Sequence, residues 1–298
     1  MSKYFLGIDA GSSSTKWAVV DEHKTEIIRG KSAPVDGHLY NEESRKRIST
    51  FLTELHSEIK YPISAIYAGV TGASDLPEEN YAIENVIKEY FADSKAKVVM
   101  DVALGYRSNV RDEVGIYIYA GTGSIAVYKD SKGSFRTVGG WGYLLGDEGA
   151  GYWIGIAALR AILFEIEKRE HNSRLIEIFR SEKDKVTFLR IKELVYGSAR
   201  SEVAALAKEV LALANSGDEK AIEIAKQAAA ELSTLVKRTQ ALVGSDRGPI
   251  IFGGGIAGAS GALIQEMERI LAKTIQISSE DLSLDAAHFA VEDFSSTS

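Results

Sequence analysis

Three turns rich in glycine and hydroxyl side chains are the segments of this sequence best suited to hold an anion. They cover residues 9–15, 121–124 and 253–258, and each directly follows a run of apolar residues. Glycine lets a backbone approach a ligand closely and point several N–H groups at one spot, while Ser and Thr hydroxyls add donors. One such turn is more often a plain hairpin turn, but three of them predict a site for a nucleotide's phosphates.

Two aspartates follow apolar runs and could act in the same chemistry. Asp9 ends the first run of the chain, and Asp101 comes directly after the apolar residues 98–100. Strand ends in open α/β sheets point into ligand crevices. From the pattern alone, Asp101 is equally well interpreted as a catalytic carboxylate or as the N-cap of a helix over 102–110. Asp9 is interpreted as an ordinary turn residue.

Composition excludes several function classes. The chain has 298 residues, 35 Lys and Arg against 42 Asp and Glu, a formal net charge of −7, and no Cys. Without Cys there is no disulfide, thiolate zinc site, iron–sulfur cluster or catalytic thiol. The acidic balance disfavours nucleic-acid binding, and no apolar run approaches the roughly 18 residues of a membrane helix. We expect a soluble, cytoplasmic protein, since the first apolar run also ends too early for a signal peptide.

Other motif templates fail. Residues 253–258 match G-x-G-x-x-G, but a dinucleotide-binding fold needs several more strand–helix units after that motif. Gly30-Lys31-Ser32 lacks the earlier glycine of a Walker loop, because Thr25 stands at that position. The five His show no H-E-x-x-H spacing, and no G-x-S-x-G elbow of a serine hydrolase is present.

Alternating strands and helices must position the turns. An antiparallel meander is predicted first, with strands at 4–8, 16–20 and 26–29. Apolar periodicity then predicts helices at 42–60 and 79–91, with strands at 63–68 and 97–100. This order is typical of an α/β layout on one mixed sheet.

The opening pattern recurs after Val114, with strands at 115–119, 125–128 and 134–138 around the second glycine turn. Two copies of one unit predict two related domains, 1–110 and 111–298. The second domain is expected to carry a helical insertion at about 155–245.

Within that insertion, the clearest helix covers 218–243, with Asp218 as N-cap and Gly244 as its stop. The last elements expected are strands at 249–252 and 274–277 and helices at 260–272 and 285–294. The final helix could pack back on the first domain.

The turns resemble those of a known family. Residues 8–16 resemble the first phosphate loop of the sugar kinase/Hsp70/actin superfamily, and residues 120–124 resemble the second. Residues 139–142 and 146–154 closely resemble the N-acetylglucosamine kinase branch of the BadF/BadG/BcrA/BcrD ATPase-type group. Gly253-Gly254-Gly255-Ile256 is similar to that group's adenosine motif.

The resemblance implies an α/β fold of two actin-like (ribonuclease H-like) domains. Each would be built on a five-stranded mixed sheet, with ATP and a sugar in a cleft between the domains. The implied activity is ATP-dependent phosphorylation of an amino sugar or hexose at its terminal hydroxyl, with Mg²⁺ as cofactor. Dimerisation is common in the family, so a homodimer is a further expectation.

Residue roles also follow from the resemblance. Asp101 would be the general base and a sugar contact, and Asp9 would hold Mg²⁺ through water, in keeping with the preference of Mg²⁺ for few carboxylates. The implied ATP contacts are Gly11, Ser12, Ser13, Thr15, Lys16, Gly121, Thr122, Gly123, Gly254 and Gly255. The implied sugar contacts, beside Asp101, are Gly140, Trp141, Gly142, Asp147 and Glu148.

Several alternatives stay open. Asp147 and Glu148 could instead form the charged first turn of the following helix. The family's loop after the third strand usually offers an Asn to the sugar, whereas residues 34–38 supply Asp36 or His38. Glucosamine, a plain hexose, N-acetylmuramate or a 2-keto-3-deoxy sugar acid therefore remain alternative substrates.

Two further functions belong to other classes. A non-catalytic sugar or ATP sensor is an alternative. The ATP-driven activators of 2-hydroxyacyl-CoA dehydratases resemble the same group, but they need Cys-ligated iron–sulfur, which this chain cannot supply.

Overall fold

Two five-stranded mixed sheets form the framework of the protein. The computed structural model describes residues 3–11, 14–110, 114–169, 173–179, 187–245, 248–259, 261–279 and 281–295. The strand orders are β3-β2-β1-β4-β5 and β10-β9-β6-β7-β8. In both sheets a three-stranded antiparallel meander continues into two parallel strands, so the predicted repeat and fold class are confirmed.

The chain divides into two compact units. The first unit consists of residues 1–111 and 279–298, and the second of residues 112–278. The sequence predicts a boundary near residue 110, and the structure assigns the last helix to the first unit. Among the described residues, no helix is both long and apolar enough to span a bilayer.

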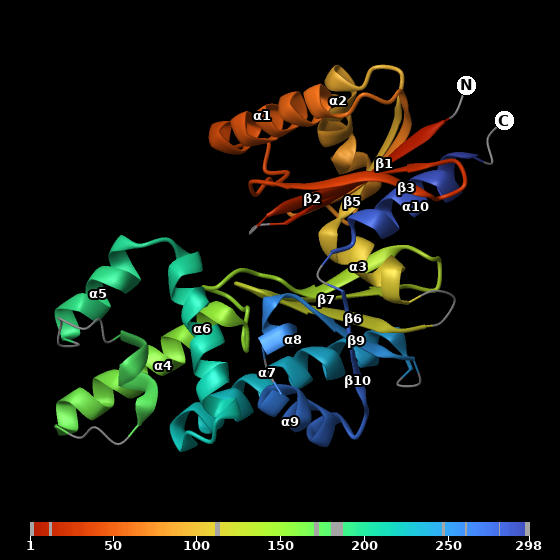
Figure 1. Ribbon diagram of the computed structural model, residues 1–298. Coiled ribbons are helices and arrows are strands. Elements are labelled where there is room, and N and C mark those ends of the chain that lie inside the picture. The colour runs from red at the N-terminus through yellow and green to blue at the C-terminus, as the bar shows by residue number, and fades with distance from the viewer. Residues whose placement is uncertain are drawn as a thin grey trace. The chain divides into compact units, whose positions relative to one another are not determined.

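The first unit is a sheet with helices on both faces (Figure 1). Its elements are β1 (Tyr4–Ala10), β2 (Thr15–Asp21), β3 (Glu26–Ser32), α1 (Glu42–Glu58), β4 (Ile63–Val70), α2 (Tyr81–Tyr90), β5 (Lys95–Met100), α3 (Asp101–Asn109) and α10 (Ser283–Ser295). Alternate strand residues face opposite sides. One set packs with α1 and α2, and the other packs with α3 and α10.

The second unit adds a group of helices to its sheet. Its elements are β6 (Ile116–Ala120), β7 (Ser124–Lys129), β8 (Phe135–Gly139), α4 (Gly151–Lys168), α5 (Phe188–Gly197), α6 (Arg200–Asn215), α7 (Glu219–Val243), β9 (Ile250–Gly253), α8 (Gly255–Ala259), α9 (Gly261–Leu271) and β10 (Ile275–Ile277). One continuous apolar core joins the sheet to α4, α6, α7, α8 and α9.

The long helix α7 follows its sequence signals. The Asp218 side chain accepts the Ala221 N–H at 2.9 Å, which satisfies one of the unpaired donors of the first turn. Gly244 ends the helix with φ 70°, a left-handed conformation that glycine adopts without strain. Both predicted ends of this helix are therefore confirmed.

Two helices are divided more finely than expected. Residues 77–80 form a separate 3-10 turn before α2, since Pro77 lies at the first helical position. The predicted helix over 260–272 is preceded by the short helix α8, whose sequence is too rich in glycine to show an apolar period.

The last helix of the chain packs directly on the first sheet. Helix α10 contacts β1, β2 and β4, and its backbone comes so close to β1 that Gly7 has no room for a side chain. A Cβ atom at Gly7 would lie 2.1 Å from Ser283 O and 2.1 Å from Ala287 N. Both contacts are with backbone, which cannot rotate away.

We expect Gly7→Ala to destabilise the first unit by displacing α10 from the sheet. Overpacking of this kind lowers the free energy of unfolding by about 3 kcal/mol, measured by urea denaturation. Gly197→Ala is the matched control, because a Cβ there meets nothing within 4 Å. Equal stability of the two variants would contradict the close packing of α10.

Candidate functional site

The carboxyl ends of three parallel strands meet at one edge of the first sheet. β4 pairs in parallel with β1 and with β5, and the register places Val70 beside both Ala10 and Met100. Thr71 and Asp101 directly follow the ends of β4 and β5. The Thr71 N–H donates to Ala10 O at 2.9 Å, which links this edge to the first glycine turn.

Asp101 lies half-buried at this edge, and each of its carboxylate oxygens accepts a hydrogen bond. Thr71 Oγ1 donates to Oδ2 at 2.6 Å, and the Val102 N–H donates to Oδ1 at 2.9 Å. Burial raises the pKa of Asp101 from its ordinary value, and these hydrogen bonds partly oppose that rise. Helix α3 begins at Asp101, and Met100 is its N-cap, so the alternative that Asp101 is the N-cap of a helix over 102–110 is wrong.

Asp9, in β1, is a second acid of the first unit whose pKa is raised. Burial, with smaller contributions from the carboxylates of Asp101 and Asp281, raises this pKa to about 6. The N–H of Leu282, 3.3 Å from Oδ2, and the charge of Lys16 act in the opposite direction. Asp9 therefore shares its electrostatic surroundings with the predicted base.

The first phosphate loop turns tightly after β1. The Gly11 N–H donates to Ser14 O at 3.1 Å, and Lys16 pairs across the strands with Asp9. Thr15 is fully buried, and its hydroxyl has no hydrogen-bond partner among the described residues. A buried donor without a partner is costly, so an acceptor from a ligand would stabilise this loop.

Ser12 and Ser13, which were also predicted phosphate contacts, lie outside the described residues.

The loop between β3 and α1 packs on the segment that follows β4. The Gly37 N–H donates to Thr71 O at 2.8 Å, and a Cβ at Gly72 would lie 2.7 Å from His38 Nε2. Asp36 binds His38 Nδ1 at 3.0 Å and Arg47 at 2.7 Å. Both oxygens of Asp36 are thus engaged, while the imidazole of His38 is placed beside Gly72.

In the second unit, the second phosphate loop is bound to the segment that leads into α4. The N–H groups of Gly151 and Tyr152 donate to the carbonyls of Gly121 and Thr122, at 2.8 and 3.1 Å. Ser124 Oγ donates to Glu148 O at 3.0 Å. The predicted phosphate loop and the predicted sugar segment therefore form one hydrogen-bonded assembly.

Asp147 points its carboxylate at the same loop. Ser124 N–H donates to Oδ1 at 3.3 Å, and a Cβ at Gly123 would lie only 2.4 Å from Oδ2. Burial raises the pKa of Asp147, while the Ser124 N–H and the charge of Arg200 lower it. Helix α4 begins at Gly151, so the alternative that Asp147 and Glu148 form its first turn is wrong.

Trp141 stands between two glycines, both of which adopt a left-handed backbone conformation. Gly140 and Gly142 have φ 69° and 83°, and the Trp141 side chain is 58% exposed. The guanidinium of Arg238 lies 4.7 Å from the centre of the indole ring. An exposed indole of this kind can cover the apolar C–H face of a sugar.

The third glycine turn lies against the second. Gly254 has φ 93°, and a Cβ there would lie 2.4 Å from Ala120 O, at the end of β6. Gly255 opens α8 and has open space beside it. In the second unit the structure therefore places the second and third glycine turns and the segment around Asp147 against one another.

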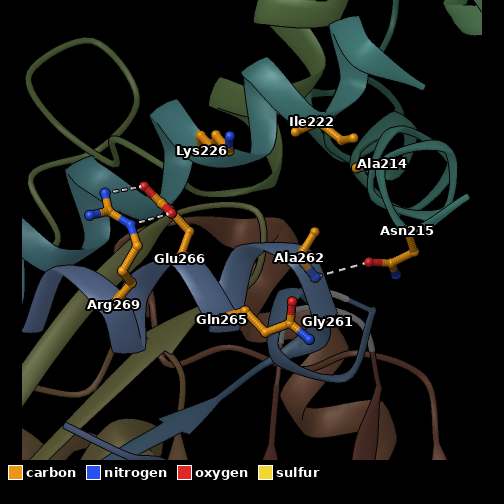
Figure 2. A pocket seen from close by; sticks show the side chains of 9 residues that line it. All are labelled: Ala214, Asn215, Ile222, Lys226, Gly261, Ala262, Gln265, Glu266 and Arg269. Atoms are coloured by element: carbon orange, nitrogen blue, oxygen red, sulfur yellow. Dashed lines mark hydrogen bonds and ion pairs between the residues drawn. The ribbon is translucent and has the colours of Figure 1, made fainter. Parts of the chain in front are cut away.

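Among the cavities that the described residues line, two in the second unit differ in their relation to the predicted site. The larger, about 1240 Å³, is lined by residues 143–148 with parts of α4, α5 and α7, and includes Asp147 and Glu148. The smaller, about 510 Å³, lies between α6, α7 and α9 and is lined by none of the predicted site residues (Figure 2). At its edge Asn215 links α8 to α9, accepting from the Ala262 N–H at 3.0 Å and donating to Ala259 O at 3.1 Å.

Some residues at these sites were missed by sequence reasoning. Thr71 could have been found, because it follows β4 as Asp101 follows β5. Asp281 approaches Asp9, and Arg200 approaches Asp147, only through the tertiary fold. No group of three or more His, Asp or Glu among the described residues could hold a metal by itself.

Solved structures with the same architecture are known. The chain matches a proposed N-acetylglucosamine kinase from Porphyromonas gingivalis with a TM-score of 0.77, 18% identity and coverage of 97% of this chain and 99% of that one. A proposed N-acetylglucosamine kinase from Chromobacterium violaceum gives a TM-score of 0.73, 21% identity and 97% and 98% coverage. At these identities the likeness establishes the fold, which is that of a two-domain, actin-like protein.

The chain belongs to the BadF/BadG/BcrA/BcrD ATPase family, whose model matches residues 6–286. It is also 29% identical over 289 residues to the N-acetylmuramic acid/N-acetylglucosamine kinase of Clostridium acetobutylicum, with 90% of each chain covered. The predicted family membership is confirmed.

The raised pKa of Asp9 gives a pH dependence of stability with a definite sign. Between the ordinary value of 3.8 and about 6, the unfolded chain has lost the proton that folded Asp9 still holds. The free energy of unfolding therefore falls as pH rises through this window, and the loss remains above it. We expect Asp9→Asn to stabilise the ligand-free protein more at about pH 8 than at about pH 5, in urea titrations.

Asp21→Asn is the control of opposite sign. The N–H groups of Thr25 and His23 hold the pKa of that exposed carboxylate below its usual range, so its removal should not stabilise the protein at the higher pH. A gain for Asp9→Asn that does not depend on pH would contradict the assignment.

Proposed function

We propose that this protein is an ATP-dependent sugar kinase that phosphorylates the terminal hydroxyl of an amino sugar of N-acetylglucosamine or glucosamine type. The observation that carries the proposal is the Asp101 carboxylate, held by Thr71 and Val102 beside the first phosphate loop. The names of the relatives from Clostridium acetobutylicum, Porphyromonas gingivalis and Chromobacterium violaceum support a carbohydrate kinase.

In this proposal Asp101 is the general base. It takes the proton from the sugar hydroxyl as that oxygen attacks the γ-phosphorus of ATP, and the bond from phosphorus to the β–γ bridging oxygen breaks. Burial raises the pKa of Asp101, which brings a carboxylate closer to the pH at which a base works best. A base contributes about 10²–10⁴-fold, and positioning and charge neutralisation supply the rest.

ATP is the second substrate. Gly11, Thr15 and Lys16, with Ser12 and Ser13, would hold its β- and γ-phosphates, and the buried hydroxyl of Thr15 offers a donor in need of an acceptor. From the second unit, Gly121, Thr122 and Gly123 would contact phosphate, and Gly254 and Gly255 would lie under the adenosine.

Mg²⁺ fits the acids that the fold supplies. Mg²⁺ usually binds one or two carboxylates and completes its shell with water and phosphate oxygens. Asp9 offers such a carboxylate, and the described residues contain no larger acidic cluster that would hold an ion without a nucleotide. When bound, the ion would neutralise phosphate charge, and Asp9 would orient one of its water ligands.

The sugar would be held by the loop before α4. Asp147 and Glu148 would accept its hydroxyl groups, Trp141 would cover its C–H face, and Gly140 and Gly142 would let the backbone approach. The cavity beside Asp147 gives room for a substituted sugar. The Clostridium acetobutylicum relative, named for both N-acetylmuramic acid and N-acetylglucosamine, supports an amino sugar.

Asp101→Asn should lower kcat at least about 100-fold, because an amide cannot take the proton. Nucleotide affinity should change by less than about threefold, since the amide leaves the phosphate loops intact. ADP formation measured with N-acetylglucosamine tests turnover, and calorimetric titration with Mg²⁺ and ATP tests binding. The exposed turn residue Asp93 gives the control Asp93→Asn, and a near wild-type rate for Asp101→Asn would refute the assignment of the base.

A panel of sugars tests the substrate class. We expect ADP formation to require sugar and to be fastest with N-acetylglucosamine or glucosamine. N-acetylmuramate, glucose and 2-keto-3-deoxygluconate form the arms for the alternative kinases. Sugar binding without ADP formation in any arm would replace the kinase by the sensor, and fastest turnover of a sugar with no amino group would refute the amino-sugar proposal.

A further inference from the structure

Thr71 is bound on three sides. Its N–H donates to Ala10 O at 2.9 Å, and its carbonyl accepts from the Gly37 N–H at 2.8 Å. Its hydroxyl donates to Asp101 Oδ2 at 2.6 Å. Both backbone groups of Thr71 are thus fixed by neighbouring segments, so the position of its hydroxyl depends only on χ1, which branching at Cβ restricts.

The ionised state of Asp101 determines which group donates in the hydrogen bond between Thr71 and Asp101. An ionised carboxylate has no proton to give, so the Thr71 hydroxyl must donate and Asp101 must accept. The Val102 N–H occupies one site on the other oxygen, at 2.9 Å. Each carboxylate oxygen keeps a second lone pair, so Asp101 can still accept a proton from a substrate.

These two donors come from different elements and define the plane of the carboxylate. Val102 belongs to α3, while Thr71 follows β4. With the Val102 bond alone, the carboxyl group could turn about its Cβ–Cγ bond, since terminal sp³–sp² torsions have broad minima. The Thr71 hydroxyl removes this freedom.

We propose that Thr71 is a positioning residue, whose hydroxyl holds the Asp101 carboxylate in the orientation that accepts the proton of the sugar hydroxyl. This inference rests on the proposed function of Asp101. Thr71 keeps its own proton throughout, because the proton that moves goes from the sugar oxygen to Asp101 and the new bond forms between that oxygen and phosphorus. Loss of this alignment should lower the rate of the chemical step and leave substrate binding largely unchanged.

The test compares two substitutions at one position. Thr71→Val keeps the shape but removes the hydroxyl, and Thr71→Ser keeps the hydroxyl. With N-acetylglucosamine as substrate, we expect Thr71→Val to lower kcat about 10- to 100-fold with less than about threefold change in either KM. Thr71→Ser should retain at least about a third of the wild-type kcat, since it restores the donor.

Thr239→Val is the matched control. Thr239 is buried, and its hydroxyl, like that of Thr71, donates to one acceptor, Leu235 O at 2.8 Å, within α7. The same chemical change there should leave kcat unchanged, and thermal melting of all variants verifies folding. If Thr71→Val does not fold, Thr71→Ala replaces it, because alanine also lacks the hydroxyl and leaves the backbone bonds in place.

The outcomes separate this inference from the proposed function. A folded Thr71→Val or Thr71→Ala with wild-type kcat overturns the inference, and so does a Thr71→Ser as slow as the variant without a hydroxyl. A loss confined to KM also overturns it. Asp101→Asn is measured in parallel: an active Asp101→Asn refutes the proposed function itself, whereas an inactive one with an active Thr71→Val refutes only the role of Thr71.

Discussion

The chemistry of the first unit depends on the parallel pairing of β4 with both β1 and β5. Parallel strands end at the same edge, so residues far apart in the sequence, such as Ala10, Thr71 and Asp101, become neighbours there. Burial at this edge shields the carboxylates of Asp9 and Asp101 from water, and the pKa values of both are raised for this reason. Sheet topology therefore sets the acid–base properties of this edge.

In the second unit, closely packed glycines bring predicted ligand-binding segments together, as strand pairing does in the first unit. Gly123 makes room for the Asp147 carboxylate, Gly151 comes within 2.8 Å of Gly121 O through its N–H, and Gly254 lies against Ala120. At Gly151 and Gly254 the contact is with backbone, so a Cβ atom there would push two predicted ligand-binding segments apart, whereas a Cβ at Gly123 would displace the Asp147 side chain. The glycines thus act mainly by allowing segments to touch, in addition to any approach to a ligand.

Most of the framework follows from local signals in the sequence. The strands around both glycine turns, the caps of α7 and the repeat of the sheet topology were predicted, because period-two burial, N-caps and glycine stops act over a few residues. The electrostatic interactions of Asp281 with Asp9 and of Arg200 with Asp147 were not predicted. They join segments that are distant along the chain, and no spacing rule relates them. Thr71 was missed although it directly follows β4, as Asp101 directly follows β5.

The docking of α10 on the first sheet has a consequence for how the chain folds during synthesis. Residues 279–298 complete a unit whose other residues, 1–111, are made first. The second unit, by contrast, is continuous in sequence. The sheet of the first unit must therefore wait for residues 279–298, and the part of its face that α10 covers, which includes Phe5 and Tyr67, stays exposed until then. Chaperones that bind exposed apolar surface would have their longest opportunity on that face.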